Sequence, residues 1–572
     1  MASSTSGNNQ DISENGTDHD GVDDSRAMSN EPLTADQNAW SLFNTLCFDG
    51  GGIRGIFSLL VLKKLMECIK NEEARQSTGN GEQPVTSSFS LCDQPSSVSH
   101  IRIGQGEEQP QQYLPCHYFD LMCGTSTGGL IAIMLSRLRM PVKDCLEEYK
   151  RLGGFVFGAP RYVHGVGLLG FAGVSREKFD TEKLELAIRD VLHRRGEIST
   201  GSPSGMLFQT QRGLCRCFVI ANYRQSMFHE GDRFILRSYQ LRDATKDHGI
   251  RTKPLNAKHR ASIAVWKVAR ATTAAPHYFK PLKIYLDDGD VIKEGDREVS
   301  GLDNGGVLKR RLRSASKHIS FFKRNDIARP TELIAGDIQN IREYGQFTDG
   351  GFGGSVLPAN NPSQEALEEI GFLKRKHQRV GTFVSIGTAR GIPKTKIGQT
   401  IGDSARNAFD QASEVRGPHV HMVAAARAKQ GMHEFDYFRL DSEDGLDGLE
   451  MDNWMPQNSG DTTIERIESA FEQWLAAEGT TTSLEQCAKK LVETRRKRSQ
   501  DRSMWDRYAI GKYFVCSLEN CTKDSDETWN YSKSFEHHLR SDHNITDETK
   551  VQDLLESCQV SGWTYKPPPT LA

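Results

Sequence analysis

Two glycine-rich loops constrain the fold of this chain more than any other feature, because each lies between an apolar run and a helical pattern. The first is Cys47-Phe-Asp-Gly-Gly-Gly-Ile-Arg-Gly55, and apolar residues at helical spacing follow it over residues 56–69. The second is Gly124-Thr-Ser-Thr-Gly128, between the apolar run 118–123 and a helical pattern over 129–138. Such strand, loop and helix units predict an α/β fold with a mostly parallel central sheet flanked by helices.

Composition divides the chain into four parts with different predicted structures. The N-terminal part carries eight acidic side chains and almost no bulky apolar residues, so it cannot offset the entropy of ordering. The α/β part is interrupted by two polar or charged segments that contain many glycines. The predicted parts are a disordered acidic tail (1–38), the α/β domain (39–400) with insertions at 72–112 and 283–345, a mostly helical C-terminal extension (401–505), and a zinc-finger-like segment with a tail (506–572).

The bulk composition names no partner but indicates a compartment. The formal net charge is −3, and the 12 cysteines are unevenly spaced without a recognisable secretory signal, which predicts reduced thiols in an intracellular, cytoplasmic protein. The most apolar segment, Gly129-Leu-Ile-Ala-Ile-Met-Leu135, is far shorter than the roughly 20 residues that cross a bilayer. We therefore expect at most peripheral association with a membrane.

Ser126 is the candidate nucleophile. Its loop fits the pattern Gly-x-Ser-x-Gly, in which a sharp strand-to-helix turn lifts a serine hydroxyl clear of the sheet. Five-residue matches also arise by chance in glycine-rich chains, but the predicted strand and helix on either side supply the context that the turn requires. A serine nucleophile also needs a base and a site for the negative charge that grows on the substrate carbonyl oxygen.

The first glycine loop is the candidate for that anion site. It leads into a helix N-terminus, where backbone N–H groups converge and the dipole favours negative charge. A nucleotide phosphate would suit such a loop equally well, but the Gly-Lys-Ser/Thr of the Walker pattern and the following acidic residue of the Rossmann pattern are both absent. We favour an oxyanion hole formed by Gly50, Gly51, Gly52 and Ile53; a glycine turn that serves only backbone geometry is the alternative.

In order and context, these motifs resemble those of the patatin-like phospholipases. The resemblance spans residues 45–388 and adds Asp349-Gly-Gly351, Asn360-Asn-Pro362 and the segment Ala269-Arg-Ala-Thr-Thr-Ala-Ala-Pro276. It implies a three-layer architecture and a lipid acyl hydrolase of the phospholipase A or lysophospholipase type, with no catalytic cofactor. In this family Ser126 would attack the acyl ester of a lipid and Asp349 would accept its proton.

The implied Ser/Asp dyad makes chemical demands on its surroundings. A carboxylate is a far weaker base than the alkoxide that it must help to create, so the dyad depends on exclusion of water and on the oxyanion hole. Arg54 lies inside the first motif, where it would hold the loop or bind a lipid phosphate. We take it as a substrate-binding candidate.

Two other functions compete with the dyad. The first is a Ser-His-Asp esterase, in which Asp349 would orient a later histidine such as His377, His419 or His421. None of these histidines lies in a recognisable catalytic loop, so this class ranks second. The other is a lipid-binding or scaffold protein without catalytic activity, which the intact motifs do not favour.

The C-terminal segment contains a pattern typical of zinc ligands. Cys516, Cys521, His538 and His543 follow the order of a two-Cys, two-His finger, with His537 as an alternative to His538. So short a segment buries little apolar surface, and bound zinc would supply folding free energy. We do not expect sequence-specific nucleic-acid binding, because one finger reads only about 3 base pairs; a protein partner or another part of this chain is the favoured contact.

A basic segment in the second insertion is a candidate for membrane contact. Lys309-Arg-Arg-Leu-Arg313 lies near Phe321 and Phe322, and clustered basic residues attract anionic lipids while aromatic side chains settle at the interface. A solvated insertion loop is an equally good explanation of the same residues.

Overall fold

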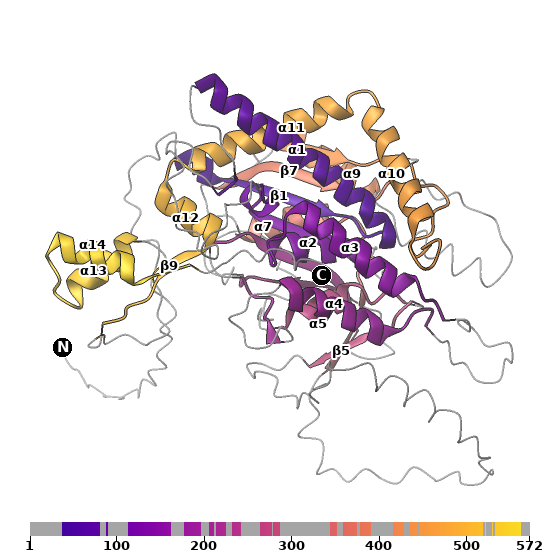
Figure 1. The fold of residues 1–572 in the computed structure, drawn as a ribbon, viewed down its shortest axis with the longest axis horizontal. Coiled ribbons are helices and arrows are strands. Elements are labelled where there is room, and N and C mark those ends of the chain that lie inside the picture. The colour runs from indigo at the N-terminus through magenta and orange to yellow at the C-terminus, as the bar shows by residue number, and fades with distance from the viewer. Residues whose placement is uncertain are drawn as a thin grey trace, which may run out of the picture.

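The computed structural model describes a central β-sheet with helices on both faces (Figure 1). The described residues are 37–80, 87–89, 113–161, 177–195, 205–210, 213–224, 232–241, 263–276, 278–285, 344–351, 359–373, 378–390, 416–427, 435–443, 445–518, 521, 529 and 532–561. The predicted acidic tail lies outside them except for residues 37 and 38, as does the basic segment at 309–313 with Phe321 and Phe322. Within these residues, no helix is both long and apolar enough to span a membrane.

The sheet runs in the order β5-β6-β3-β2-β1-β7-β8, with β4 also paired to β3. The pairs β1·β2, β1·β7, β2·β3 and β7·β8 are parallel, whereas β4 and β6 run antiparallel to β3. The strands are β1 (Leu42–Phe48), β2 (Leu121–Thr125), β3 (Arg216–Arg224), β4 (Asp232–Arg237), β5 (Leu282–Tyr285), β6 (Tyr344–Asp349), β7 (Arg379–Ile386) and β8 (Asp436–Leu440). The prediction of a mostly parallel sheet flanked by helices is confirmed.

Alternate residues of the central strands enter two separate apolar cores, one on each face of the sheet. In β1, Leu46 and Phe48 join the larger core, whereas Phe43 and Cys47 join the smaller one. Period-two burial on both faces is what a covered parallel sheet requires. Helices α7 (Ser363–Leu373) and α9 (Arg416–Arg427) cover the smaller core, and the larger core holds α1 (Gly55–Asn80), α2 (Thr127–Ser136), α3 (Val142–Phe157), α4 (Thr181–Arg195), α5 (Val265–Thr272), α10 (Asp461–Ala476) and α11 (Thr480–Arg498).

The C-terminal extension is part of this body, so the predicted domain boundary at residue 400 is too early. Strand β8 pairs in parallel with β7 at the edge of the sheet. Helices α10 and α11 lie along α1 in Figure 1, and Phe57 of α1 packs edge-on against Trp474 of α10. Residues well beyond 400 therefore form part of the sheet and of the helices that cover it. The predicted insertion at 72–112 also starts too early, because α1 continues to Asn80.

The basic run at 495–498 is buried, apart from Lys497. Arg496 donates to the carboxylate of Glu73 on α1 at 2.8 Å, and Arg498 forms hydrogen bonds to both carboxyl oxygens of Asp120 at 2.9 and 3.0 Å. Arg498 also donates to the Leu42 carbonyl at 2.6 Å. These buried, hydrogen-bonded cations tie the extension to the start of β1 and to the residue before β2.

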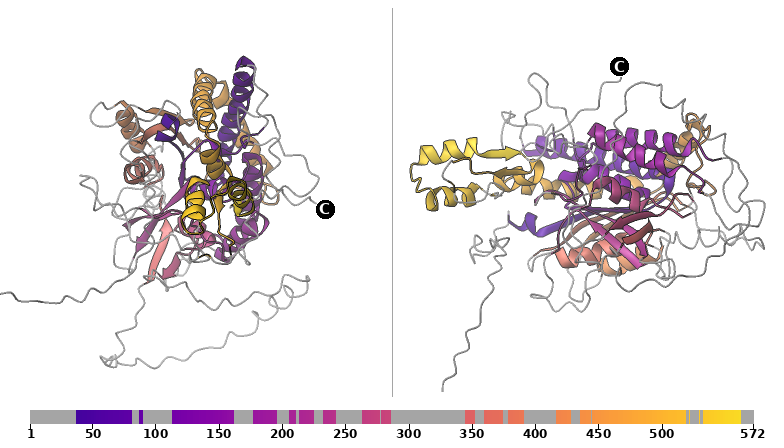
Figure 2. Two further views of the ribbon diagram at one scale, coloured as in Figure 1. Left: turned by 90° about the vertical axis from the view of Figure 1, so that its left-hand side faces the viewer. Right: turned by 90° about the horizontal axis from the view of Figure 1, so that it is seen from below.

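A small C-terminal unit stands apart from the main body in Figures 1 and 2. It pairs β9 (Lys512–Phe514) with β10 (Gln559–Ser561) and packs α13 (Ser532–Ser541) against α14 (Glu548–Ser557), and it follows α12 (Arg502–Ile510). Its own apolar core centres on Phe514, Phe535 and Leu539.

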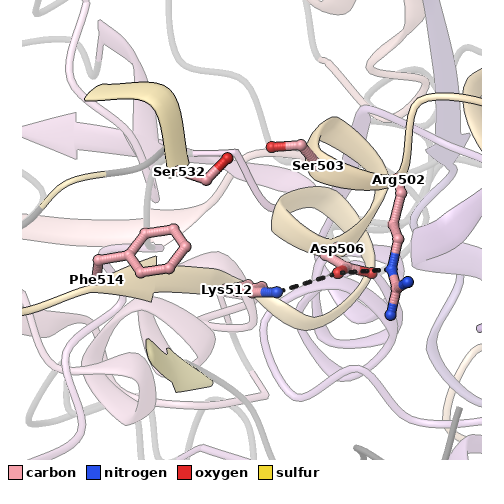
Figure 3. A pocket seen from close by; sticks show the side chains of 6 residues that line it. All are labelled: Arg502, Ser503, Asp506, Lys512, Phe514 and Ser532. Carbon is pink, nitrogen blue, oxygen red and sulfur yellow. Dashed lines mark hydrogen bonds and ion pairs between the residues drawn. The ribbon is translucent and has the colours of Figure 1, made fainter. Parts of the chain in front are cut away.

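A pocket of about 230 Å³ lies at the joint between α12 and this unit (Figure 3). Lys512 reaches the carboxylate of Asp506 at 3.4 Å, and Arg502 lies 4.0 Å from the same carboxyl oxygen. No residue of the two glycine loops lines this pocket.

Candidate active site

Strand β3 brings the two predicted catalytic residues together. Strand β2 pairs with β3, and its last residue, Thr125, lies opposite Ile220 of β3. Strand β6 pairs with β3 from the next residue onward, so that Asp349 of β6 lies opposite Ala221 of β3. Because β4 occupies the other edge of β3 over 218–223, β2 and β6 share one edge and meet end to end. Ser126 directly follows β2 and Asp349 is the last residue of β6, so both lie at this meeting point.

Ser126 occupies a strained turn. Its backbone has φ 56° and ψ −129°, values that L-residues rarely adopt and that are characteristic of functional turns. A Cβ atom on Gly128 would lie 2.4 Å from the Asp49 carbonyl oxygen, so only glycine permits this close approach. Thr272 braces the turn, because its hydroxyl accepts a hydrogen bond from the Ser126 N–H at 3.0 Å and donates to the Ile220 carbonyl at 2.7 Å.

Asp349 is completely buried, and burial raises its pKa to about 7. Hydrogen bonding from the Ser126 hydroxyl and from the Gly351 N–H acts in the opposite direction; the latter bond is 2.9 Å long. The Asp349 Oδ2 atom has no hydrogen bond of ordinary geometry to any described residue. The Ser126 hydroxyl nevertheless lies close enough to the carboxylate to lower the pKa of Asp349. The main chain is held by Asn222, which donates to the Asp349 carbonyl at 2.9 Å, and by Ala274, whose carbonyl accepts from the Asp349 N–H at 3.0 Å.

The first glycine loop lies directly against Ser126. A Cβ atom on Gly50 would be 3.1 Å from the Ser126 Cβ. Asn360 fixes this residue from both sides, since its carbonyl accepts from the Gly50 N–H at 3.1 Å and its side chain donates to the Gly50 carbonyl at 3.2 Å. Asn360 of the Asn360-Asn-Pro362 motif therefore holds the start of the glycine loop in place.

The structure divides the four expected oxyanion donors into two pairs. The Gly50 N–H is bonded to Asn360, and the Ile53 N–H donates to the Met451 carbonyl at 2.8 Å. The Gly51 N–H makes only a long contact of 3.4 Å to the Thr127 hydroxyl, and the Gly52 N–H has no partner among the described residues. In this conformation Gly50 and Ile53 shape the loop, and Gly51 and Gly52 are the N–H groups left for an anion.

Arg54 is buried at 7 % exposure, and its Nη1 donates to the Leu449 carbonyl at 3.2 Å. This contact favours the first of the two roles considered for Arg54, holding the loop. Together with the bond from the Ile53 N–H to Met451, it attaches the glycine loop to residues 449–451 of the extension.

A buried ion pair lies immediately before the glycine loop. Arg439 of β8 donates to both carboxyl oxygens of Asp49, at 3.0 and 2.6 Å, and also reaches Asp441 at 2.6 Å. Burial raises the pKa of Asp49 to about 6, and Arg439 opposes the rise. Sequence reasoning missed this pair, because an arginine 390 positions away in the chain carries no local signal.

Histidines do not approach the catalytic pair in the described part of the chain. Neither Ser126 nor Asp349 shares a hydrogen bond with a histidine there. His419 lies on α9 beside the Tyr437 hydroxyl at 3.2 Å, and His421 is exposed on the same helix. His377 lies outside the described residues.

The C-terminal unit brings the four predicted metal ligands together. The ligand atoms of Cys516, Cys521, His538 and His543 all lie within 4.8 Å of one another. The Cys516 Sγ is 3.4 Å from His543 Nε2, and the Cys521 Sγ is 3.6 Å from His538 Nε2.

The imidazole of His538 is oriented by Asp542, whose carboxylate lies 2.9 Å from Nδ1. The alternative residue, His537, is exposed and contacts only the Ser541 hydroxyl at 3.5 Å among its described neighbours. The geometry therefore selects His538 over His537 as the fourth member of the cluster.

Comparison with known proteins agrees with this geometry. Residues 46–292 match the family model described as patatin-like phospholipase. The calcium-independent phospholipase A2-gamma of Rattus norvegicus is 24% identical over 236 residues, which is 41% of this chain and 22% of the relative. Phospholipase A I of Arabidopsis thaliana is 27% identical over 206 residues, 30% of this chain and 15% of the relative. The matched part thus spans less than a quarter of the length of each of these relatives, and the resemblance to patatin-like phospholipases is confirmed.

Proposed function

We propose that this chain, which carries a patatin-like phospholipase domain, hydrolyses carboxylic ester bonds of phospholipids or related acyl lipids. The observation that carries the proposal is the meeting of Ser126, at a strained strand-to-helix turn, with the buried carboxyl of Asp349 and the glycine loop. The relatives named as phospholipases support the lipid class of the substrate.

In the proposed reaction the Ser126 hydroxyl attacks the ester carbonyl while Asp349 accepts the hydroxyl proton. Negative charge then develops on the carbonyl oxygen, next to the N–H groups of Gly51 and Gly52 and the start of α1, where preorganised donors act strongly because water is excluded. The alcohol leaves with the proton from Asp349. In a second step water attacks the acyl-Ser126 ester while Asp349 takes a proton from it, and Asp349 returns that proton to the Ser126 oxygen as the fatty acid leaves.

The raised pKa of Asp349 suits this role. A carboxylate with an ordinary pKa would be a poor base, whereas a pKa of about 7 brings it near the operating pH, where general bases are most effective. The same burial that raises the pKa also excludes water from the attacking hydroxyl.

Active-site labelling tests the proposal. A fluorophosphonate should label the wild type but not Ser126→Ala. It should also label the control variant Ser136→Ala, because Ser136 is a buried serine at the far end of α2, the helix that begins directly after Ser126. A chromogenic acyl ester should be turned over by the wild type and Ser136→Ala only. Full activity in Ser126→Ala, or labelling that persists in it, would refute the assignment.

Histidine variants separate the dyad from a triad. With a Ser/Asp dyad, His377→Ala, His419→Ala and His421→Ala should retain activity while Asp349→Asn loses it. A folded histidine variant with activity lower by about 10⁴-fold would place the protein among Ser-His-Asp esterases instead.

We also propose that the C-terminal unit binds one zinc ion through Cys516, Cys521, His538 and His543. Tetrahedral zinc with bonds of about 2.3 Å to sulfur and 2.0 Å to nitrogen separates sulfur from nitrogen by about 3.5 Å, and the two closest pairs here are 3.4 and 3.6 Å apart. The ion would stabilise this small unit and take no part in hydrolysis.

Elemental analysis of the full chain should find about one zinc per protein, lost in Cys516→Ser and kept in His537→Ala. Zinc that is absent from the wild type, or retained in the cysteine variant, would contradict the proposal. Ester turnover by Cys516→Ser should continue, because the unit stands apart from Ser126.

A further inference from the structure

An apolar crevice begins one residue from the nucleophile. It is lined by Thr127 and Ile53 at one end, by Tyr149, Leu152 and Phe157 of α3, and by Trp454 of the extension. Thr127 directly follows Ser126, and Ile53 belongs to the glycine loop. No charged side chain lines the crevice within the described residues. The crevice therefore suits the apolar acyl chain of a lipid ester better than its polar head group.

The indole ring of Trp454 forms part of the wall of this narrow crevice. Only about 10 Å³ of free space remains, roughly enough for a single water molecule. A Cβ atom on Gly153 would lie 3.0 Å from the ring, and one on Gly460 would lie 2.2 Å from it, so these glycines allow the ring to lie flat against the backbone. An acyl chain cannot share the space with the ring.

One polar atom of the ring is poorly accommodated. Trp454 is 4 % exposed, and its Nε1 is buried without a hydrogen-bond partner in the described part of the chain. A buried donor without an acceptor is unfavourable, and contact with water or with a lipid oxygen would remove the penalty. Trp454 is followed by the exposed Met455, and the facing helix α3 carries the exposed Phe155.

Building on the proposed function, we infer that Trp454 occupies the place of the substrate's acyl chain and that the size of residue 454 sets the chain length that the enzyme accepts. A short acyl group needs little of this space. A longer chain must displace the ring. The free energy lost when the indole leaves its buried position offsets part of the free energy gained by burying the additional methylene groups of the chain.

Two soluble esters of different length test this inference. The ratio of kcat/KM for p-nitrophenyl decanoate to that for p-nitrophenyl butyrate should rise about tenfold in Trp454→Ala, the scale of one buried apolar side chain. Trp454→Phe should raise the ratio less, because a smaller ring remains. Trp474→Phe is the matched control: Trp474 is also a buried tryptophan of the extension, but its ring packs against Phe57 and Phe471.

The outcomes separate this inference from the proposed function. An unchanged or lower ratio in Trp454→Phe and Trp454→Ala, or an equal rise in Trp474→Phe, would overturn the inference while leaving ester hydrolysis by Ser126 in place. If Trp454→Ala does not fold, Trp454→Phe alone decides. A wild type that turns over neither ester would remove the proposed function, and the inference with it.

Discussion

Replacing Asp349 by asparagine should abolish hydrolysis and yet make the protein more stable above pH 7. The folded-state pKa of Asp349 lies above its ordinary value because the carboxyl is fully buried. Between about pH 4 and pH 7 the folded chain therefore binds a proton that the unfolded chain has released. Stability falls as pH rises through this window, and it stays reduced above pH 7, where the carboxylate is buried and charged.

The size of the effect follows from the two pKa values. A change from 3.8 to about 7 corresponds to roughly 4 kcal/mol of lost stability at pH 8, and to roughly 2 kcal/mol at pH 5. Asparagine has the same shape and does not titrate, and its side-chain oxygen can still accept from the Gly351 N–H. The stability gained by Asp349→Asn should therefore be larger at pH 8 than at pH 5 by about 2 to 3 kcal/mol.

Denaturant and thermal unfolding of wild type and Asp349→Asn at pH 5 and pH 8 measure this difference. Equal stability of Asp349→Asn and wild type at both pH values would show that Asp349 is not buried as the structure has it.

Three further predictions concern single residues. The kcat/KM for a chromogenic ester should rise with pH and level off above about pH 7, with about a tenth of the plateau at pH 6, because the base must be ionised; a flat profile from pH 5 to 9 would exclude Asp349 as the base. Arg439→Lys should lower kcat by up to about 10²-fold through a misplaced glycine loop, with the protein still folded by circular dichroism; unchanged kcat would show that the pair does not position the loop. Asp542→Asn should weaken zinc binding about 10- to 100-fold in chelator competition, because it frees the His538 ring; equal affinity would mean that the ring is held by packing alone.

The local parts of the site were predictable from the sequence. The two glycine loops fall after β1 and β2 as expected, and Ser126 lies at the predicted turn, because glycine content and apolar periodicity are local signals. The Asp349 motif begins at the end of β6, and the mostly parallel sheet follows from alternating strands and helices.

The remote parts of the site were not predictable in this way. The extension contacts the glycine loop through the side chain of Arg439 and through the backbone carbonyls of Leu449 and Met451. A backbone carbonyl is present in every residue, so such an acceptor cannot be recognised from the sequence. The basic run at 495–498 misleads for a related reason. Consecutive arginines usually mark a solvated surface, whereas Arg495 and Arg498 here are 1 % exposed, in part because carbonyls and carboxylates of distant segments accept from them.

The contacts of the candidate site extend beyond the residues that the family model matches. The family model ends at residue 292, before Asp349 and before Asn360, which fixes Gly50. Beyond these, the Ile53 N–H donates to the Met451 carbonyl, and this bond holds the loop directly after Gly51 and Gly52, whose N–H groups are left for an anion. An oxyanion hole gains its effect from donors that need no reorganisation during the reaction. A glycine loop without the extension would keep its N–H groups but lose the contacts that hold them in place, so in the proposed mechanism the extension would contribute to the oxyanion hole without supplying a catalytic side chain.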